Sequence, residues 1–268
     1  MTPPTPPRAL EVAVAAAEAA GQIVIESFRQ PQEITVKGRG NLLTETDLKS
    51  ERFLHETFRR EFPDCAIMSE ETAADTAIDG WVWVIDPLDG TKNFTAGIPH
   101  FCVNIALCYD GEPLAGVTYD PNQRECFQAE RGGGAFVNGQ PIHASDKPDV
   151  VSSVLGVDIG YDNERGRAVL EMVNRLFPRM QGLRVSGSAA LGMAYAACGR
   201  FDLFIHRYLF PWDIAAGMLL VQEAGGVATS ETGQPIDITS KTVIAGGQRV
   251  HADFLEWQRA QGPDFEST

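Results

Sequence analysis

The sequence predicts a mixed α/β fold in which helices come first, an antiparallel sheet follows, and strands alternate with helices in the second half. Apolar residues recur at helical spacing through the first 62 residues. Between residues 101 and 137, short β-branched and aromatic runs are separated by turns such as Asp-Gly and Asp-Pro-Asn. With 268 residues, 44% of them hydrophobic, the chain can bury a core as one large domain or two closely packed halves.

Two helices are expected before the first strands. Residues 8–28 are Ala-rich, and residues 46–62 repeat the helical pattern. Thr44 or Thr46 can cap the second helix, which places Asp47 in its first turn, where the helix dipole favours a carboxylate. Asp47 therefore either caps this helix alone or has a chemical role as well.

The remaining elements follow in two groups. The first group consists of strand-like segments at residues 66–68, 81–85, 103–107, 114–119 and 125–129. After the turn at residues 146–149 we expect strand 151–157, helix 164–177, strand 182–185, helix 189–198, strand 201–205 and helix 214–224. This turn is the best boundary between two subdomains, residues 1–145 and 146–268.

Composition excludes several classes of protein. Thirty-six acidic against 22 basic residues give a net charge of −14, which argues against nucleic-acid and anionic-membrane binding. Trp81, Trp83 and Trp212 are accordingly predicted to be core residues and not a base-stacking platform. The five cysteines form no C-x-x-C pair and lie mostly in apolar sequence, as buried free thiols in a reducing cytosol would. No apolar run reaches membrane-spanning length, so we expect a cytoplasmic protein.

The most informative segment is Asp86-Pro87-Leu88-Asp89-Gly90-Thr91, which follows the apolar run at residues 81–85. Two carboxylates and a loop carbonyl at a strand end are hard oxygen ligands, suited to Mg²⁺ or Mn²⁺. The amides of Gly90 and Thr91, where a short helix could begin, favour phosphate. An ordinary Asp-Pro-Gly turn is the alternative interpretation.

Two distant segments favour the metal site over a plain turn. Glu70 and Glu71 follow the apolar residues 66–68, again at a predicted strand end. Asp213 precedes the apolar helix expected at residues 214–224. The sequence therefore predicts that carboxylates from three parts of the chain share one divalent-metal site.

In this order the motifs resemble the inositol monophosphatase family of magnesium-dependent, lithium-sensitive phosphatases. The resemblance covers nearly the whole chain and includes Asp47, Glu70-Glu71, the segment at residues 86–91, and Trp212-Asp213 with Gly225-Gly226. It implies a layered α-β-α-β-α sandwich of the sugar-phosphatase type, with the metal site between the two halves. It also implies a homodimer.

The resemblance assigns the metal ligands. Glu70, Asp86 and the Leu88 carbonyl would hold one Mg²⁺, and Asp86, Asp89 and Asp213 would hold a second, so that Asp86 bridges the two. In some members of the family Glu70 also contributes to a third ion. Two such ions stabilise the attacking and leaving oxygens of an in-line displacement, and one lowers the pKa of the attacking water.

The resemblance also assigns the catalytic groups. Thr91, hydrogen-bonded to Asp47, would act with Glu70 to orient and deprotonate the attacking water. The amides of Gly90 and Thr91 would hold phosphate oxygens, and Asp89 would also belong to the substrate-binding residues.

Two basic residues stand near the expected site. Lys37 resembles the family's basic residue beside the active-site loop, and Arg39 follows it. The Gly-rich residues 38–41 are either a flap over the site or a solvated loop.

On the substrate side, Gly187, Ser188 and Ala189 correspond to family residues that line the sugar or inositol pocket, although Gly187 and Ser188 could also simply start and cap a helix. His206 departs from the family pattern. It lies seven residues before Asp213, where inositol-cleaving members carry a glutamate that accepts a hydrogen bond from a ring hydroxyl. Inositol 1-phosphate is therefore not expected to be strongly preferred.

The sequence thus predicts a Mg²⁺-dependent phosphomonoesterase for a small phosphorylated polyol or sugar. Within the same superfamily the alternatives are a nucleotide 3′-phosphatase acting on adenosine bisphosphate, a fructose-1,6-bisphosphatase and a histidinol phosphatase. A different class is a non-catalytic metal-binding regulatory protein. Phosphate release from a panel of substrates distinguishes these alternatives.

Overall fold

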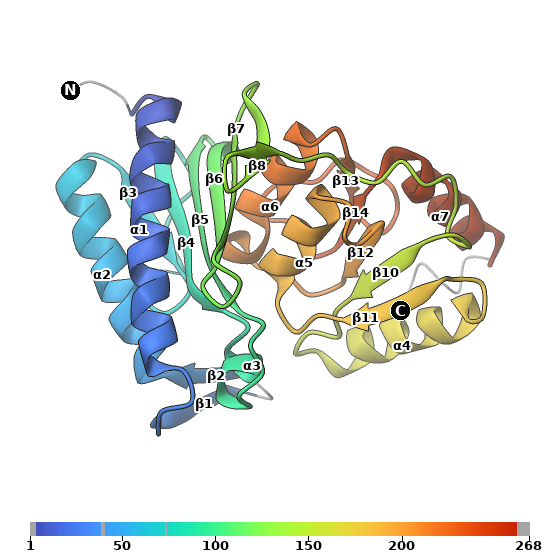
Figure 1. Cartoon of the computed structure of the whole chain (residues 1–268), viewed down its shortest axis with the longest axis horizontal. Helices are drawn as coiled ribbons and strands as arrows, with labels where there is room; N and C mark the ends of the chain where they lie inside the picture. Colours follow the sequence, from blue (N-terminus) through green and yellow to red (C-terminus); the bar gives the residue numbers. More distant parts are fainter. Residues whose placement is uncertain (1–3, 39–40, 73, 262–268) are drawn as a thin grey trace.

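The computed structural model describes residues 4–38, 41–72 and 74–261, and these residues form five layers (Figure 1). Two helices cover the outer face of a seven-stranded sheet, two more lie between this sheet and a five-stranded sheet, and two cover the far side. The predicted α-β-α-β-α sandwich is therefore confirmed. In layer order the helices are α1 (Pro6–Ser27) with α2 (Glu45–Glu61), α5 (Ala189–Ala197) with α6 (Pro211–Glu223), and α4 (Asn163–Leu176) with α7 (Gln248–Ala260).

The seven-stranded sheet has its strands in sequence order, and only its first pair is parallel. The strands are β3 (Ala66–Ser69), β4 (Trp81–Asp89), β5 (Cys102–Tyr109), β6 (Glu112–Asp120), β7 (Glu125–Glu130), β8 (Gly134–Val137) and β9 (Gln140–Pro141). The antiparallel pairing predicted for residues 101–137 is confirmed. The sequence analysis missed β8 and β9, because two to four residues are too few to show a period.

The five-stranded sheet has the order β11-β10-β12-β14-β13. Its strands are β10 (Val154–Val157), β11 (Gly182–Val185), β12 (Leu203–His206), β13 (Val227–Thr229) and β14 (Val243–Gly246). The first three in sheet order are parallel, and β14 and β13 are antiparallel additions that the sequence analysis did not predict. The carboxyl ends of the parallel strands lie at one edge of the sheet, where α/β proteins usually bind ligands.

The middle layer is built from small residues. Helices α5 and α6 are buried on nearly every side and share one core with both sheets. A Cβ atom at Gly217 would lie 2.6 Å from the Met193 Cβ, and one at Gly116 would lie 3.0 Å from the Ala216 Cα. This close packing fixes both helices against the seven-stranded sheet.

Three predicted boundaries were wrong by three or four residues, for local reasons. Strand β4 runs through Asp89 and not only to residue 85, because its pairing with β5 resumes after an irregularity between Asp86 and Asp89. Strand β10 begins at residue 154 and not 151, because Asp149 accepts hydrogen bonds from Ser152 in a turn. Helix α6 begins at Pro211 and not at residue 214, because proline suits the first helical position.

The sequence analysis treated residues 38–41 as a flap or a loop and predicted neither of the strands that adjoin them. Strands β1 (Ile34–Gly38) and β2 (Asn41–Thr44) pair as an antiparallel two-stranded sheet, and residues 39–40 lie outside the described residues. Elsewhere, Trp83 and Trp212 are buried and Trp81 packs on Tyr109, as expected of core residues.

All five cysteines are free, three of them buried and two half-buried. None of the helices in the described part of the chain combines the length and apolar character that crossing a membrane requires.

Candidate active site

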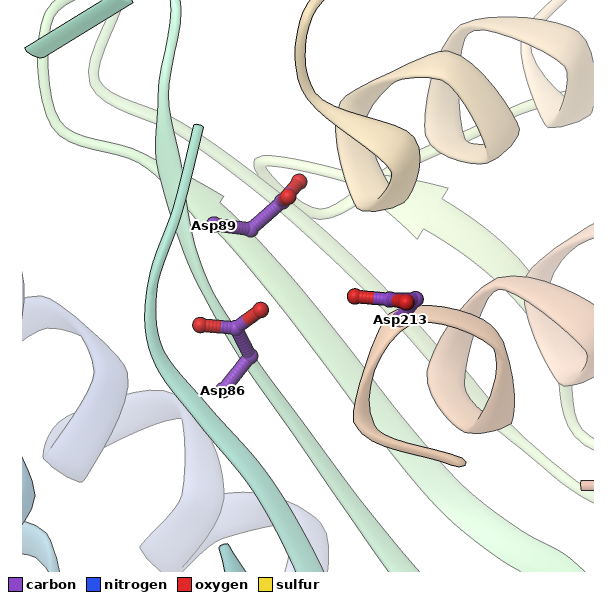
Figure 2. A group of neighbouring side chains, drawn as sticks. All are labelled: Asp86, Asp89 and Asp213. Carbon is purple, nitrogen blue, oxygen red and sulfur yellow. The ribbon is translucent and has the colours of Figure 1, made fainter. Parts of the chain in front are cut away.

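Three aspartates converge where the two halves of the chain meet. Asp86 and Asp89 lie at the end of β4, and Asp213 lies in the first turn of α6. One carboxylate oxygen from each lies within 4.8 Å of the others. Figure 2 shows the three side chains directed into a common space between strand and helix. The sequence analysis expected these residues to meet, and the structure brings them together.

The start of α6 fixes Asp213. Pro211 occupies the first helical turn, and the Phe210 amide donates to Asp213 Oδ2 at 2.7 Å, which completes a capping arrangement. One oxygen of Asp213 is therefore held by its own helix. The other is left to face the remaining aspartates.

Asn104 joins the two metal-facing elements, and the sequence analysis missed it. On β5, it lies opposite Asp86 in the sheet register. Its Nδ2 donates to the Trp212 carbonyl at 2.7 Å, and its Oδ1 accepts from the Thr118 hydroxyl at 2.7 Å. The signal was available, because an asparagine at the centre of an apolar strand needs hydrogen-bond partners when it is buried.

Asp89 is held from behind by the start of α5. The Ser188 hydroxyl and the Ala190 amide, the latter at 2.9 Å, both donate to Asp89 Oδ2. Ser188 was predicted to bind substrate, but its side chain is buried beneath Asp89. It therefore positions a carboxylate, whereas its neighbours Gly187 and Ala189 lie on the wall of a cavity.

Asp47 makes two separate contacts, one as part of a helix cap and one with Thr91. Its Oδ2 accepts from the Thr44 amide at 2.8 Å in a capping box, so Thr44 is the cap of α2. Its Oδ1 lies 3.1 Å from the Thr91 hydroxyl. That hydroxyl is also 3.0 Å from the Leu88 carbonyl, so its single proton is shared between two acceptors. Capping and a contact with Thr91 are thus compatible.

Glu70 approaches the site from β3 together with Glu71. Lys37 on β1 lies 3.4 Å from Glu70 Oε1 and 2.6 Å from Glu71 Oε2, measured from its Nζ. The structure therefore places Lys37 beside the predicted ligand Glu70 and its neighbour Glu71. Arg39 lies outside the described residues.

A buried glutamate on α2 holds the loop that carries Glu70. Glu51 Oε1 accepts from the amides of Glu71 and Thr72, each at 3.2 Å, and from the Ser69 hydroxyl. Since Glu51 sits inside a helical pattern, nothing in its immediate sequence distinguished it from a surface glutamate.

Burial makes ionisation of these carboxyl groups costly. It raises the pKa of Asp86 and Asp213 well above the usual range, and the neighbouring acids raise both further. Burial and then Glu71 raise the pKa of Glu70 to about 8, although Lys37 opposes the shift. A divalent cation would relieve this repulsion, and a set of hard oxygen donors fits Mg²⁺ or a similar ion.

A small cavity of about 50 Å³ opens beside the aspartates. Residues from both halves of the chain line it, and six of them were predicted site residues: Asp89, Gly90, Gly187, Ala189, His206 and Asp213. Gly90 and Gly187 both have positive φ, and added side chains would meet the His100 carbonyl and the Asn93 amide, respectively. The predicted phosphate and substrate segments therefore share one cavity.

The remaining lining residues were missed: Lys92, Asp158, Gly160, Tyr161 and Tyr208. Asp158 carried the same signal as Glu70 and Asp86, an acid directly after an apolar strand. Lys92 Nζ lies 4.2 Å from the centre of the Tyr161 ring, although nearly 70 residues separate the two in sequence. Only the tertiary structure brings that pair together.

Comparison with known proteins gives a consistent result. The model of the inositol monophosphatase family matches residues 7–261. Inositol monophosphatase 1 of Solanum lycopersicum is 39% identical over 254 residues, covering 92% of this chain and 93% of the relative. Nus factor SuhB of Escherichia coli (strain K12) is 38% identical over 259 residues, covering 95% of this chain and 97% of the relative.

Solved structures agree with the fold. The extragenic suppressor protein suhB from Bartonella henselae has a TM-score of 0.86 at 33% identity, with 92% of this chain and 97% of that chain covered. SaIMPase-II with bound inositol monophosphate has a TM-score of 0.77 at 28% identity, with 94% and 95% covered. The same protein has also been solved with 2′AMP.

Proposed function

The chain belongs to the inositol monophosphatase family of phosphoric monoester hydrolases, and we propose that it is a Mg²⁺-dependent phosphomonoesterase acting on a small phosphorylated polyol or sugar. The observation that carries this proposal is the convergence of Asp86, Asp89 and Asp213 beside both the Asp47–Thr91 pair and a cavity. Each of these parts is required to hold metal, water and substrate together.

We propose that the ligands divide between two ions, with a third using Glu70 as in some family members. Glu70, Asp86 and the Leu88 carbonyl would hold the first Mg²⁺, and Asp86, Asp89 and Asp213 the second. When bound, the ions would stabilise the attacking and leaving oxygens and lower the pKa of water. The buried, mutually repelling carboxyl groups support this assignment, because they are stable as anions only beside a cation.

Protein groups around the proposed metals would accept the proton of the attacking water and bind the phosphate. Asp47 can accept a hydrogen bond from the Thr91 hydroxyl, and the Thr91 oxygen can then accept a hydrogen bond from water. Glu70 would take the proton of that water. The amides of Gly90 and Thr91 at the start of α3 (Thr91–Thr95) would hold phosphate oxygens. Lys37, paired to Glu70, would set the charge of that base.

A nucleotide phosphatase is the second candidate, and one observation favours it. An outer cavity of about 430 Å³ shares Lys92, Gly160 and Tyr161 with the inner one. It offers room and an aromatic ring for a leaving group as large as a nucleoside. Fructose-1,6-bisphosphate and histidinol phosphate stay in the panel of candidate substrates. A non-catalytic regulatory role is disfavoured by the intact set of site carboxylates.

Further proposals concern the whole protein. We expect a homodimer, in the cytoplasm, with no nucleic-acid or membrane partner. We also propose that residues 1–145, which carry most metal ligands, and residues 146–268, which carry Asp213 and the substrate wall, are the two subdomains. Light scattering of the purified protein tests the dimer, and a nucleic-acid binding assay tests the second expectation.

The decisive experiment is phosphate release by the purified chain. We expect turnover of inositol 1-phosphate and other phosphomonoesters with Mg²⁺, loss of turnover in chelator, and recovery when Mg²⁺ is restored. We also expect Li⁺ to inhibit. No release from any member of the panel with Mg²⁺ would refute the enzyme proposal, whereas resistance to Li⁺ would remove only the lithium expectation.

A further inference from the structure

The inner cavity has a polar wall made by two neighbouring parallel strands. Val157 on β10 pairs with Ile205 on β12, so the next residues, Asp158 and His206, follow side by side at the carboxyl ends. The Asp158 amide donates to the Ile205 carbonyl at 3.1 Å, which continues the pairing to the cavity edge. Both side chains line the cavity beside Asp89 and Asp213.

His206 presents a hydrogen-bond donor to this cavity. The Tyr208 amide donates to its Nδ1 at 3.0 Å, so Nδ1 carries a lone pair and the proton of the neutral ring is on Nε2. Burial lowers the pKa of His206 and keeps the ring neutral, although Asp158 opposes the shift. The ring is 95% buried (5% exposed), and Nε2 has no hydrogen-bond partner among the described residues. Nε2 is not among the fully buried unpartnered atoms of the described side chains, so it can be reached from the cavity, where a ligand acceptor can pair with it.

Asp158 presents an acceptor beside that donor. Its Oδ1 accepts from the Ile159 amide at 2.8 Å, and the Gly160 amide lies 3.5 Å away. No described residue donates to its Oδ2. Within the part of the chain that the structure describes, the acceptor lost at position 206 is therefore replaced one strand away, on β10.

The charged residues that line the cavity favour some chemical groups of a ligand over others. Lys92 is the one cation among the described residues that line the cavity, and Asp158, Asp89 and Asp213 line the same cavity. A second anionic group on the substrate would be repelled by Asp158. An ammonium group would meet the N–H of His206. A hydroxyl group is both donor and acceptor and matches both residues.

Resting on the proposed phosphatase function, we propose that Asp158 is a specificity-determining residue that accepts a hydrogen bond from a hydroxyl of the leaving alcohol, with His206 donating to that hydroxyl or its neighbour. The substrate class is then a polyol phosphate with a free hydroxyl beside the phosphate ester. Where inositol-cleaving members of the family carry one glutamate, this chain has an acceptor, Asp158, at the end of β10 and a donor, His206, at the end of β12.

The test compares two substrates that differ only in hydroxyl groups, inositol 1-phosphate and cyclohexyl phosphate. The wild type should favour inositol 1-phosphate in kcat/KM. Asp158→Asn keeps the size and the contact with the Ile159 amide but turns a donor toward the cavity. It should lower kcat/KM for inositol 1-phosphate at least about tenfold and leave cyclohexyl phosphate within about twofold. Glu164→Gln, the same charge change at an exposed position of α4, should alter neither.

Each other outcome counts against the proposal. An equal loss for both substrates would show that Asp158 acts on the metal site and not on the hydroxyl. If Asp158→Asn causes no loss, or if the wild type shows no preference between the two substrates, Asp158 and His206 do not recognise hydroxyl groups. Either result would leave the proposed phosphatase activity unaffected. Failure to hydrolyse cyclohexyl phosphate and every other phosphomonoester would instead refute the enzyme proposal itself. Thermal unfolding of Asp158→Asn, expected within a few degrees of the wild type, checks that the variant is folded.

Discussion

The two sheets contribute different chemistry to one cavity. The seven-stranded sheet supplies Glu70, Asp86 and Asp89 at the ends of β3 and β4, where the carboxyl groups are buried or half-buried and burial raises their pKa values. The five-stranded sheet supplies Asp158 and His206 at the ends of β10 and β12, where Asp158 Oδ2 and His206 Nε2 have no hydrogen-bond partner among the described residues. We propose that the first region holds cations and that the second recognises the group to which the phosphate is attached.

This comparison explains why one region follows the family pattern and the other departs from it. A metal site needs several carboxylates at once, and loss of one leaves the others buried and uncompensated. A substrate wall needs only complementary donors and acceptors, which can move to a neighbouring strand. We therefore expect that substitutions can change catalysis and substrate selectivity separately in this protein.

The largest effect is expected from a substitution that disrupts only the proposed metal site at the edge of the seven-stranded sheet. Asp86→Asn removes the carboxylate shared by both proposed metal sites, so kcat should fall at least about a hundredfold for every substrate. The ratio of kcat/KM between substrates should not change. Steady-state kinetics on the panel at saturating Mg²⁺ provides the measurement. Asp79→Asn, an exposed change just before β4, is the matched control, and full activity of Asp86→Asn would refute the metal assignment.

A smaller effect is expected from the link between the two metal-facing elements. Asn104→Leu leaves the Trp212 carbonyl and the Thr118 hydroxyl without their partner, which loosens Asp213 relative to Asp86. The Mg²⁺ concentration for half-maximal activity should rise about tenfold, and stability should fall by about 1–3 kcal/mol. Magnesium titrations and urea unfolding report the two effects separately. A loss of stability with an unchanged magnesium requirement would show that Asn104 serves the fold only.

The second region can be rebuilt instead of broken. His206→Glu alone places a carboxylate beside Asp158, so like-charge repulsion should prevent any gain in preference for inositol 1-phosphate. The double change Asp158→Asn with His206→Glu exchanges acceptor and donor between the strands. It should recover several-fold of the preference over cyclohexyl phosphate that Asp158→Asn loses. A large gain from His206→Glu in the otherwise native chain would contradict the acceptor role of Asp158.

The smallest effect concerns pH and metal together. The pKa of Glu70 is about 8 in the folded protein without metal, against an ordinary value of 4.5. The folded state therefore holds this proton more tightly than the unfolded chain. Its contribution to stability is full below about pH 4.5 and is lost as the pH rises through about 8.

Bound metal stabilises the ionised form of Glu70 and so removes this loss of stability. At higher pH, fewer protons compete with the metal for the carboxylate. The increase in Tm on adding Mg²⁺ should thus be larger at pH 8 than at pH 6, by roughly 3 °C. Differential scanning calorimetry with matched NaCl as the control measures it. An equal or larger increase at pH 6 would contradict the raised pKa of Glu70.

The sequence by itself determined the parts that depend on neighbours in the chain. Helical spacing predicted α1 and α2, and apolar runs with turns predicted the antiparallel strands. Acids placed directly after strands identified Glu70, Asp86 and Asp89. These signals are local, because a strand end or a cap is defined by the few residues around it. The order of the motifs then indicated the family and its layered sandwich.

Only the tertiary structure decided which groups from distant segments share a surface. It placed Ser188 behind Asp89 instead of in the cavity, and it brought Asn104 between Asp86 and the start of α6. It also set Asp158 beside His206, although they lie 48 positions apart in the sequence. Parallel strand pairing joins residues at large and variable separations, and no local period records which strands become neighbours.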